Sequence, residues 1–276
     1  MSQDETRPNQ HAWSDVDKAP DTQAFAAYLD TIRTLDAIGE YKRRSIELMR
    51  LQPGHRALDL GCGTGDDTCK VANAVGPGGS ALGVDFSGAM VDESRRRWEG
   101  AGLPISFAVG DVHKLDLPSA HFDAVRADRV FQHLAAPMHA LAELVRVTRP
   151  GGRVVVSDPD WGTYILDAPP TPAVLKYHDL AQRQAKNPWI GRQFFGMFRE
   201  LGLVELDLTA HVAFFLDLDV LEKLGNLDAG FITAVQTGQL TEAEVAEVKG
   251  TLRERQSARR FLASVTIYTV AGTVPG

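Results

Sequence analysis

The sequence predicts an α/β fold in which a mostly parallel sheet carries helices on both faces. Short apolar runs alternate with helical segments of about ten residues along the middle of the chain. A glycine-rich turn follows the first run, and acids close several runs. The chain has 276 residues, 44% of them hydrophobic, which is enough for one substantial core. We therefore expect one elaborated domain.

Two segments precede this alternating pattern. Residues 1–20 are polar and acidic, lack the apolar stretch of a signal peptide, and predict a disordered tail. Residues 21–50 repeat apolar side chains at intervals of three and four, which predicts cap helices separated at Gly39. The main domain then covers residues 51–276.

The first half of the main domain alternates strand and helix. The helix after the glycine turn ends at the cluster Gly76–Gly79, and Pro150-Gly151-Gly152 turns a later helix into the fifth strand. The expected strands are one that ends at residue 59 and those over residues 81–85, 105–109, 122–127 and 153–157. The expected helices cover residues 67–75, 87–99 and 138–148.

After Asp158 several prolines interrupt the alternation. They predict an insertion of irregular and helical pieces over about residues 159–202, which would cover the site. Two longer strands, 203–215 and 263–271, follow, with an amphipathic helix, 241–255, between them. Ligands in such sheets bind beyond the carboxyl ends of the strands, so the acids at these ends are candidates for binding.

The stretch from Asp59 to Gly65 carries the strongest chemical signal. Glycine tolerates positive φ and lets a ligand approach bare backbone. The spacing is GxGxG, so the third glycine comes one position too early for a dinucleotide site. The acids Asp66-Asp67 follow where a phosphate loop places lysine and serine or threonine.

With its upstream acid, this turn resembles motif I of the class I S-adenosylmethionine (SAM) dependent methyltransferases. The run Asp-Leu-Gly-Cys-Gly-Thr-Gly through Arg-Pro-Gly-Gly, then Val-Ser-Asp-Pro-Asp-Trp-Gly, is similar to the ubiquinone/menaquinone-biosynthesis type. The resemblance implies a Rossmann-like, seven-stranded sheet whose last strand runs antiparallel. It also implies SAM as the cofactor.

On this resemblance, Asp59 and the glycine turn face the amino-acid end of SAM, Asp85 the ribose diol and Asp111 the adenine amino group. Each acid alone is more often an ordinary turn residue, but three acids at three successive strand ends favour a SAM site. The expected cofactor-binding residues are Asp59, Gly61, Cys62, Gly63, Gly65, Asp85, Phe86, Met90, Gly110, Asp111, Val112, Ala127 and Arg129.

Methyl transfer from a sulfonium needs alignment more than acid–base chemistry, and a base only where the acceptor loses a proton. His133, just past the fourth strand, is the first candidate base; the alternative is that it lines the cofactor. Asp158 lies at the rim of the site, where a turn-forming role is the alternative. The expected catalytic residues are His133, Asp158 and Tyr28.

Aromatic side chains outside the basic sheet predict an apolar, roughly drug-sized acceptor. The expected substrate-binding residues are Tyr28, His133, Asp160, Trp161, Trp189, Arg192 and Phe195. The resemblance leaves O-, N- and C-methylation open, including alkylation of a prenyl double bond that leaves a carbocation. A SAM-binding protein without transfer activity is the alternative from another class.

The composition of the chain limits the kinds of partner that we expect it to bind. A net charge of −7 disfavours nucleic acid, and no apolar run is long enough to predict a membrane span. Two cysteines outside any CxxC pair suit a reduced, cytoplasmic protein, and no ligand set predicts a metal. The partner expected is a small-molecule substrate. A homo-oligomer stays open, because the cap helices could cover their own site or that of a second copy.

Overall fold

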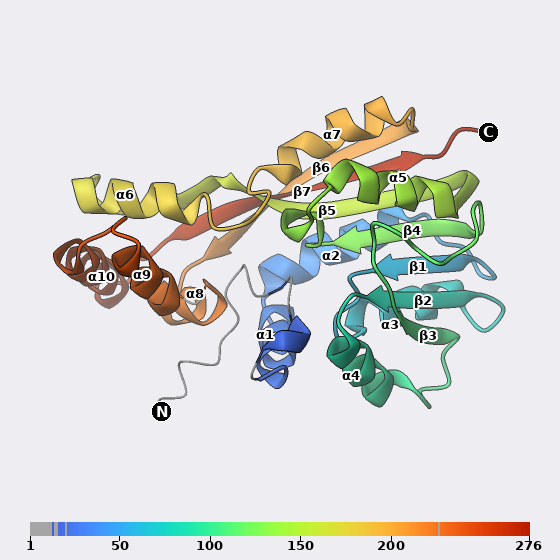
Figure 1. Cartoon of the computed structure of the whole chain (residues 1–276), viewed down its shortest axis with the longest axis horizontal. Coiled ribbons are helices and arrows are strands. Elements are labelled where there is room, and N and C mark those ends of the chain that lie inside the picture. The colour runs from blue at the N-terminus through green and yellow to red at the C-terminus, as the bar shows by residue number, and fades with distance from the viewer. Residues whose placement is uncertain (1–12, 14–15, 20, 226) are drawn as a thin grey trace.

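The computed structural model describes residues 13, 16–19, 21–225 and 227–276. Its centre is a seven-stranded sheet in the order β3-β2-β1-β4-β5-β7-β6 (Figure 1). The strands are β1 Arg56–Leu60, β2 Ser80–Asp85, β3 Ile105–Val109, β4 Phe122–Asp128, β5 Thr148–Leu166, β6 Val204–Phe215 and β7 Ala263–Thr273. Pairs among β1 to β5 are parallel, and β7 runs antiparallel to both neighbours. The predicted fold class is confirmed.

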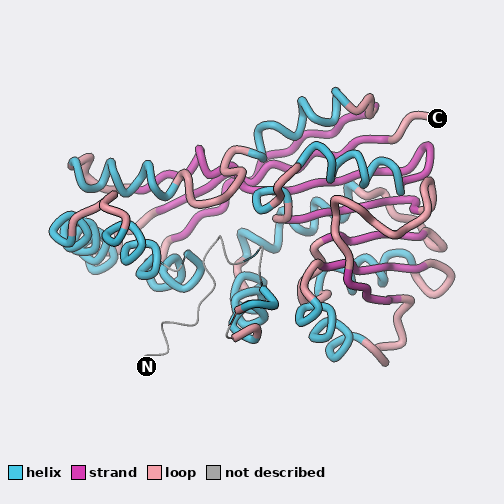
Figure 2. Tube along the Cα trace, in the orientation of Figure 1, coloured by secondary structure: helices cyan, strands magenta, loops and turns pink. Residues whose placement is uncertain are grey.

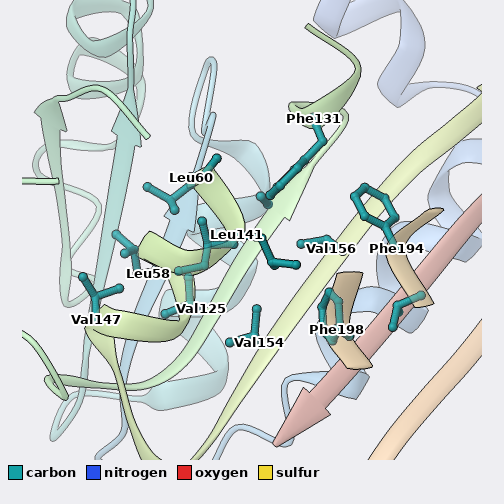
Figure 3. Packing of buried hydrophobic residues seen from close by; sticks show 14 of the residues in the cluster. Leu58, Leu60, Val125, Phe131, Leu141, Val147, Val154, Val156, Phe194 and Phe198 are labelled. Atoms are coloured by element: carbon teal, nitrogen blue, oxygen red, sulfur yellow. The ribbon is translucent and has the colours of Figure 1, made fainter. Parts of the chain in front are cut away.

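Alternating side chains of β1 explain why helices cover both faces of the sheet. Leu58 and Leu60 pack with α5 (Pro137–Val147) and α7 (Ile190–Glu200), as Figure 3 shows around Leu141 and Phe194. Ala57 faces the opposite way, toward α2 (Asp36–Leu48) and α3 (Asp66–Val75). Helix α4 (Gly88–Trp98) packs on β2 and β3. Each fully buried leucine contributes about 1.5–3 kcal/mol to folding.

The N-terminal helices depart from expectation at one point. Helix α1 (Gln23–Arg33) ends at Thr34, and α2 begins two residues later, so Gly39 lies inside α2 and the predicted break there is wrong. Most of the expected tail lies outside the described residues. Within it, the 3-10 turn η2 (Val16–Lys18) buries Val16 against α1 and α4.

Strand β5 continues well beyond the predicted end at residue 157. Its pairing with β4 stops at Ser157, and the extension pairs with β7 alone. A strand with one free side tolerates proline, because the missing N–H is not needed there. Pro159 therefore does not end the strand.

The extended strands carry a second group of helices, called the lobe here (Figures 1 and 2). The lobe consists of α6 (Pro172–Ala181), α8 (Leu218–Gly225), α9 (Leu227–Gln236) and α10 (Glu242–Ser257). The sequence predicted only the last of the three helices between β6 and β7. The insertion expected at 159–202 supplies α6 alone to the lobe, while α7 packs on the sheet. Across the described ranges, no helix has the length and apolar character to cross a membrane.

Candidate active site

A cavity of about 850 Å³ lies at the carboxyl ends of β1, β2 and β4 and continues beneath the lobe. Its near wall contains the glycine turn, and its far wall contains Leu221 and Phe231 of the lobe. Helix α1 contributes Tyr28 and Leu29 between the two walls. Two segments distant in sequence therefore share one cavity with the strand ends.

The glycine turn needs glycine at each of its three positions. Gly61, Gly63 and Gly65 have φ values of 67°, 52° and 79°, which side chains rarely adopt. A Cβ on Gly61 would collide with Val130, and one on Gly63 would lie 2.8 Å from Leu29. Gly61, Cys62 and Gly63 line the cavity, whereas Gly65 faces the interior and begins α3.

Asp85 supports the turn from β2 and also lines the cavity. It accepts hydrogen bonds from the backbone N–H of Gly63 (2.8 Å) and of Ser87 (3.0 Å). Burial raises the pKa of its carboxyl above the ordinary range. Each oxygen keeps a lone pair for a further donor. Asp85 is therefore both part of the turn's structure and a candidate ligand group.

The other predicted adenosine-side residues also line this end of the cavity. Phe86 is exposed and Met90 buried, while Gly110, Asp111 and Val112 follow β3. Asp111 accepts from the backbone N–H of His113 at 2.9 Å. Burial acts to raise the pKa of Asp111, but its bonds with His113 outweigh burial and hold that pKa below its ordinary value.

Asp59 is bound within the protein more tightly than expected. It is 2% exposed and accepts from Arg126 Nη1 at 2.9 Å and from Thr68 Oγ1 at 2.7 Å. Arg126 also pairs with Asp67 at 3.2 Å and with Asp128 at 3.3 Å. Asp67 and Asp128 in turn both contact the Lys42 ammonium. We call these three carboxylates and two cations the buried ion network.

The buried ion network was missed from the sequence, although one signal was present. Arg126 interrupts an apolar run in β4, where a lone charge needs a buried partner. Burial acts to raise the pKa of Asp67, but Lys42 and Arg126 outweigh it and hold that pKa well below its ordinary value. The same balance lowers the pKa of Asp128.

The turn that carries His133 is fixed by three surrounding groups. Asp158 accepts from the backbone N–H of Phe131 at 2.9 Å, and Trp161 Nε1 donates to the Gln132 side chain at 2.8 Å. Asn187 Nδ2 donates to the carbonyls of Phe131 (2.9 Å) and Leu134 (2.7 Å). Asn187 was not predicted, because it lies more than fifty residues away in sequence.

These contacts indicate that Asp158 stabilises the turn that carries His133. It is fully buried and does not line the cavity, whereas His133 and Tyr28 do. Burial raises the pKa of the Asp158 carboxyl well above its ordinary range.

Arg129 also lines the cavity, and neither its Nε nor Asp128 Oδ1 has a hydrogen-bond partner among the described residues. Two charged groups therefore have unused bonding capacity beside the cavity.

Several predicted residues do not reach the cavity. Asp160 is fully buried and paired with Arg192, while Trp189 and Phe195 lie on the surface, 42% and 46% exposed. Ala127 is buried within the sheet. Of the aromatic cover, Trp161 does line the cavity, together with Tyr164, Tyr177 and Phe215.

The fold and cavity can be compared with known proteins. A family model described as a methyltransferase domain matches residues 51–196. The chain is 36% identical over 246 residues to an uncharacterized 37.1 kDa protein in a Streptomyces fradiae transposon, covering 88% of this chain and 70% of that protein.

Two further relatives have more informative names. The ubiquinone/menaquinone biosynthesis C-methyltransferase UbiE of Ectopseudomonas mendocina is 34% identical over 141 residues, and the match spans about half of each chain, 50% and 52%. A solved structure of a putative methyltransferase from Bacillus halodurans has a TM-score of 0.60 at 17% identity and covers 85% of this chain and 99% of that one. The latter likeness concerns the fold alone.

Proposed function

The chain belongs to the class I SAM-dependent methyltransferase family, and from that premise we propose that it transfers a methyl group from SAM to a small, mainly apolar acceptor. The observation that carries the proposal is the single cavity. One end of it has the glycine turn and Asp85, and the other end has the apolar side chains of the lobe. Donor and acceptor would therefore meet within one cavity.

The residues at the first end fit the donor. The bare backbone at Gly61 and Gly63 leaves space that a side chain would fill. Asp85 has free lone pairs for a ribose diol, and the unpartnered Asp128 Oδ1 suits an ammonium group. Arg129 suits a carboxylate. We assign the amino-acid end to Asp128 and Arg129 with Asp59 behind them, because Asp128 Oδ1 has no hydrogen-bond partner among the described residues, whereas each Asp59 oxygen already accepts one bond.

SAM supplies an activated methyl group, so the protein's own contribution is to align the acceptor and exclude water. Tyr28 and His133 both line the cavity and would flank the acceptor atom. For a hydroxyl acceptor, His133 would take the proton. Asp158, Trp161 and Asn187 act by holding the turn that carries His133.

A quinone-type ring is the acceptor we favour within this class. Two considerations support it: the far end of the cavity is apolar, and a relative matched over half of this chain is named a quinone-biosynthesis C-methyltransferase. A screen of hydroxylated quinones, phenols, amines and prenylated compounds with labelled SAM, read by mass, tests the choice. Methylation of amines alone would contradict it.

The donor assignment has its own test. Calorimetry should show that Asp85→Ala weakens SAM by about 1.5–3 kcal/mol, the scale of hydrogen bonds to a charged group. Asp92→Ala, which removes an exposed acid on α4, is the matched control and should leave the affinity unchanged. An unchanged affinity in Asp85→Ala would remove Asp85 from the site. No binding of SAM or its demethylated product to the wild type would contradict the donor assignment.

A further inference from the structure

Two buried tyrosine hydroxyls in the hydrophobic cluster that includes the lobe helices have no hydrogen-bond partner among the described residues. Tyr164 lies on the extension of β5 and Tyr177 on α6, and both side chains line the cavity. They are 4% and 6% exposed. A buried hydroxyl without a partner destabilises a fold, and phenylalanine would fill the same space without that penalty. Two such tyrosines side by side point to a partner from outside the fold.

Most side chains packed around this tyrosine pair are apolar. Phe231 stacks on Tyr177 with ring centroids 5.2 Å apart and planes at 29°. Leu221, Ala234 and Leu240 belong to the same cluster and also line the cavity. These side chains offer no acceptor for a hydroxyl proton. Within this cluster the two hydroxyls are the polar side-chain groups, and the cavity lining adds the polar side chains of Gln184, Thr233 and Gln239.

The pair can satisfy only part of its own bonding capacity. Burial raises the pKa of Tyr164 to about 12 and that of Tyr177 well above the ordinary range, so both keep their protons near neutral pH. Tyr164 and Tyr177 belong to the same buried cluster, and each hydroxyl acts on the pKa of the other. A phenol has one proton to donate. If one hydroxyl donates to the other, one proton still lacks an acceptor.

We propose that Tyr164 and Tyr177 form an oxygen-recognising subsite that donates a hydrogen bond to the carbonyl of an apolar ring compound. The inference rests on the proposed function, which determines which end of the ligand faces the methyl donor. The atom to be methylated would lie beside Tyr28 and His133, and the carbonyl would lie at the remote end, under the lobe. Ring compounds with a carbonyl would be preferred over equally large hydrocarbons.

The test compares two probes that differ in one oxygen, 1-tetralone and tetralin. Calorimetry on the protein loaded with S-adenosylhomocysteine should give about tenfold tighter binding of 1-tetralone, as expected for one buried hydrogen bond. The double variant Tyr164→Phe/Tyr177→Phe should bind both probes alike, with tetralin as in the wild type. Tyr268→Phe, on β7 and outside the cavity lining, should keep the preference.

Three outcomes would overturn the subsite: no binding of either probe, equal binding by the wild type, or a preference that survives in the double variant. The melting temperature of the double variant is a second readout and should equal or exceed that of the wild type. A clear fall would show that the hydroxyls have partners within the fold. Failure to bind S-adenosylhomocysteine would contradict the proposed function instead, and the probe comparison repeated without it would still decide the subsite.

Discussion

Replacing Arg126 with methionine tests the buried ion network most directly. The guanidinium is 1% exposed, donates to Asp59 at 2.9 Å and lies within 3.3 Å of Asp67 and Asp128. Without it, Asp59 loses its ion-pair partner, while Asp67 and Asp128 keep the Lys42 ammonium and Asp67 also keeps Lys70. Breaking a buried pair on one side costs about 3–5 kcal/mol, because a buried charge is left uncompensated. For a domain of this size the melting temperature should fall by about 10 °C.

The loss should depend on pH with a definite sign. In the wild type the lowered pKa values of Asp67 and Asp128 stabilise the fold above their unfolded pKa, and this contribution is lost as pH falls through the folded values. In the variant these carboxyls lose a cation, so their folded pKa rises and protonation stabilises the fold as pH falls. The difference between the two proteins should therefore be largest near neutral pH and shrink toward acid.

Urea unfolding between about pH 3 and pH 7, followed by circular dichroism, measures both quantities. The matched control is Arg43→Met, which removes an exposed ion pair with Glu47 on α2 and should cost less than about 1 kcal/mol. A loss below about 1 kcal/mol for Arg126→Met, or a loss that does not vary with pH, would refute the reasoning.

Three smaller predictions follow from other contacts. Gly61→Ala places a Cβ against Val130 at a φ of 67° and should destabilise the fold by about 1–3 kcal/mol, whereas Gly39→Ala, with open space in α2, should stabilise it by up to about 1 kcal/mol. Asp17→Ala removes three hydrogen bonds to the start of α4 and should speed hydrogen exchange at the two amides it holds. Asn187→Ala should lower kcat about tenfold or more, with SAM affinity within about twofold, because the His133 turn loses two of its supports.

Each of the three has a result that counts against it. Equal stability changes in the two glycine variants, measured by thermal unfolding, would show that the strained turn is not needed. Unchanged exchange at Gly88 and Ala89 would mean that Asp17 does not cap α4. A loss of SAM affinity as large as the loss of kcat in Asn187→Ala would make Asn187 part of the donor site and not a positioning residue.

Local pattern was sufficient to predict the donor end of the molecule. The sequence identifies the glycines of the turn, and Asp85 and Asp111 at the strand ends. At each of these positions the backbone conformation depends mainly on the few residues beside it in sequence. The partner of Asp59 is not local: Arg126 lies 67 residues away on the neighbouring strand. A carboxylate that looked free for a ligand was therefore already paired.

The acceptor end was harder to predict for a different physical reason. Helices α8 and α9 are short, and Gly230, a poor helix former, lies inside the second, so neither gives a long helical pattern in the sequence. Trp189, Arg192 and Phe195 were grouped with the cover by composition. Only the packing of α7 on the sheet shows that they point elsewhere. Aromatic content predicted an apolar chamber, and tertiary packing decided which aromatics form it.

The place of β7 in the sheet has a consequence for how the chain folds. β7 comes last among the seven strands but lies between β5 and β6, which were made well before it. Strands β1 to β5 can assemble from residues close in sequence, whereas β6 has no place in the sheet until β7 arrives. Helices α8, α9 and α10 of the lobe connect these two late strands. Ligand-binding competence at the glycine turn should thus precede formation of the acceptor chamber, and substitutions in β7 should delay the chamber most.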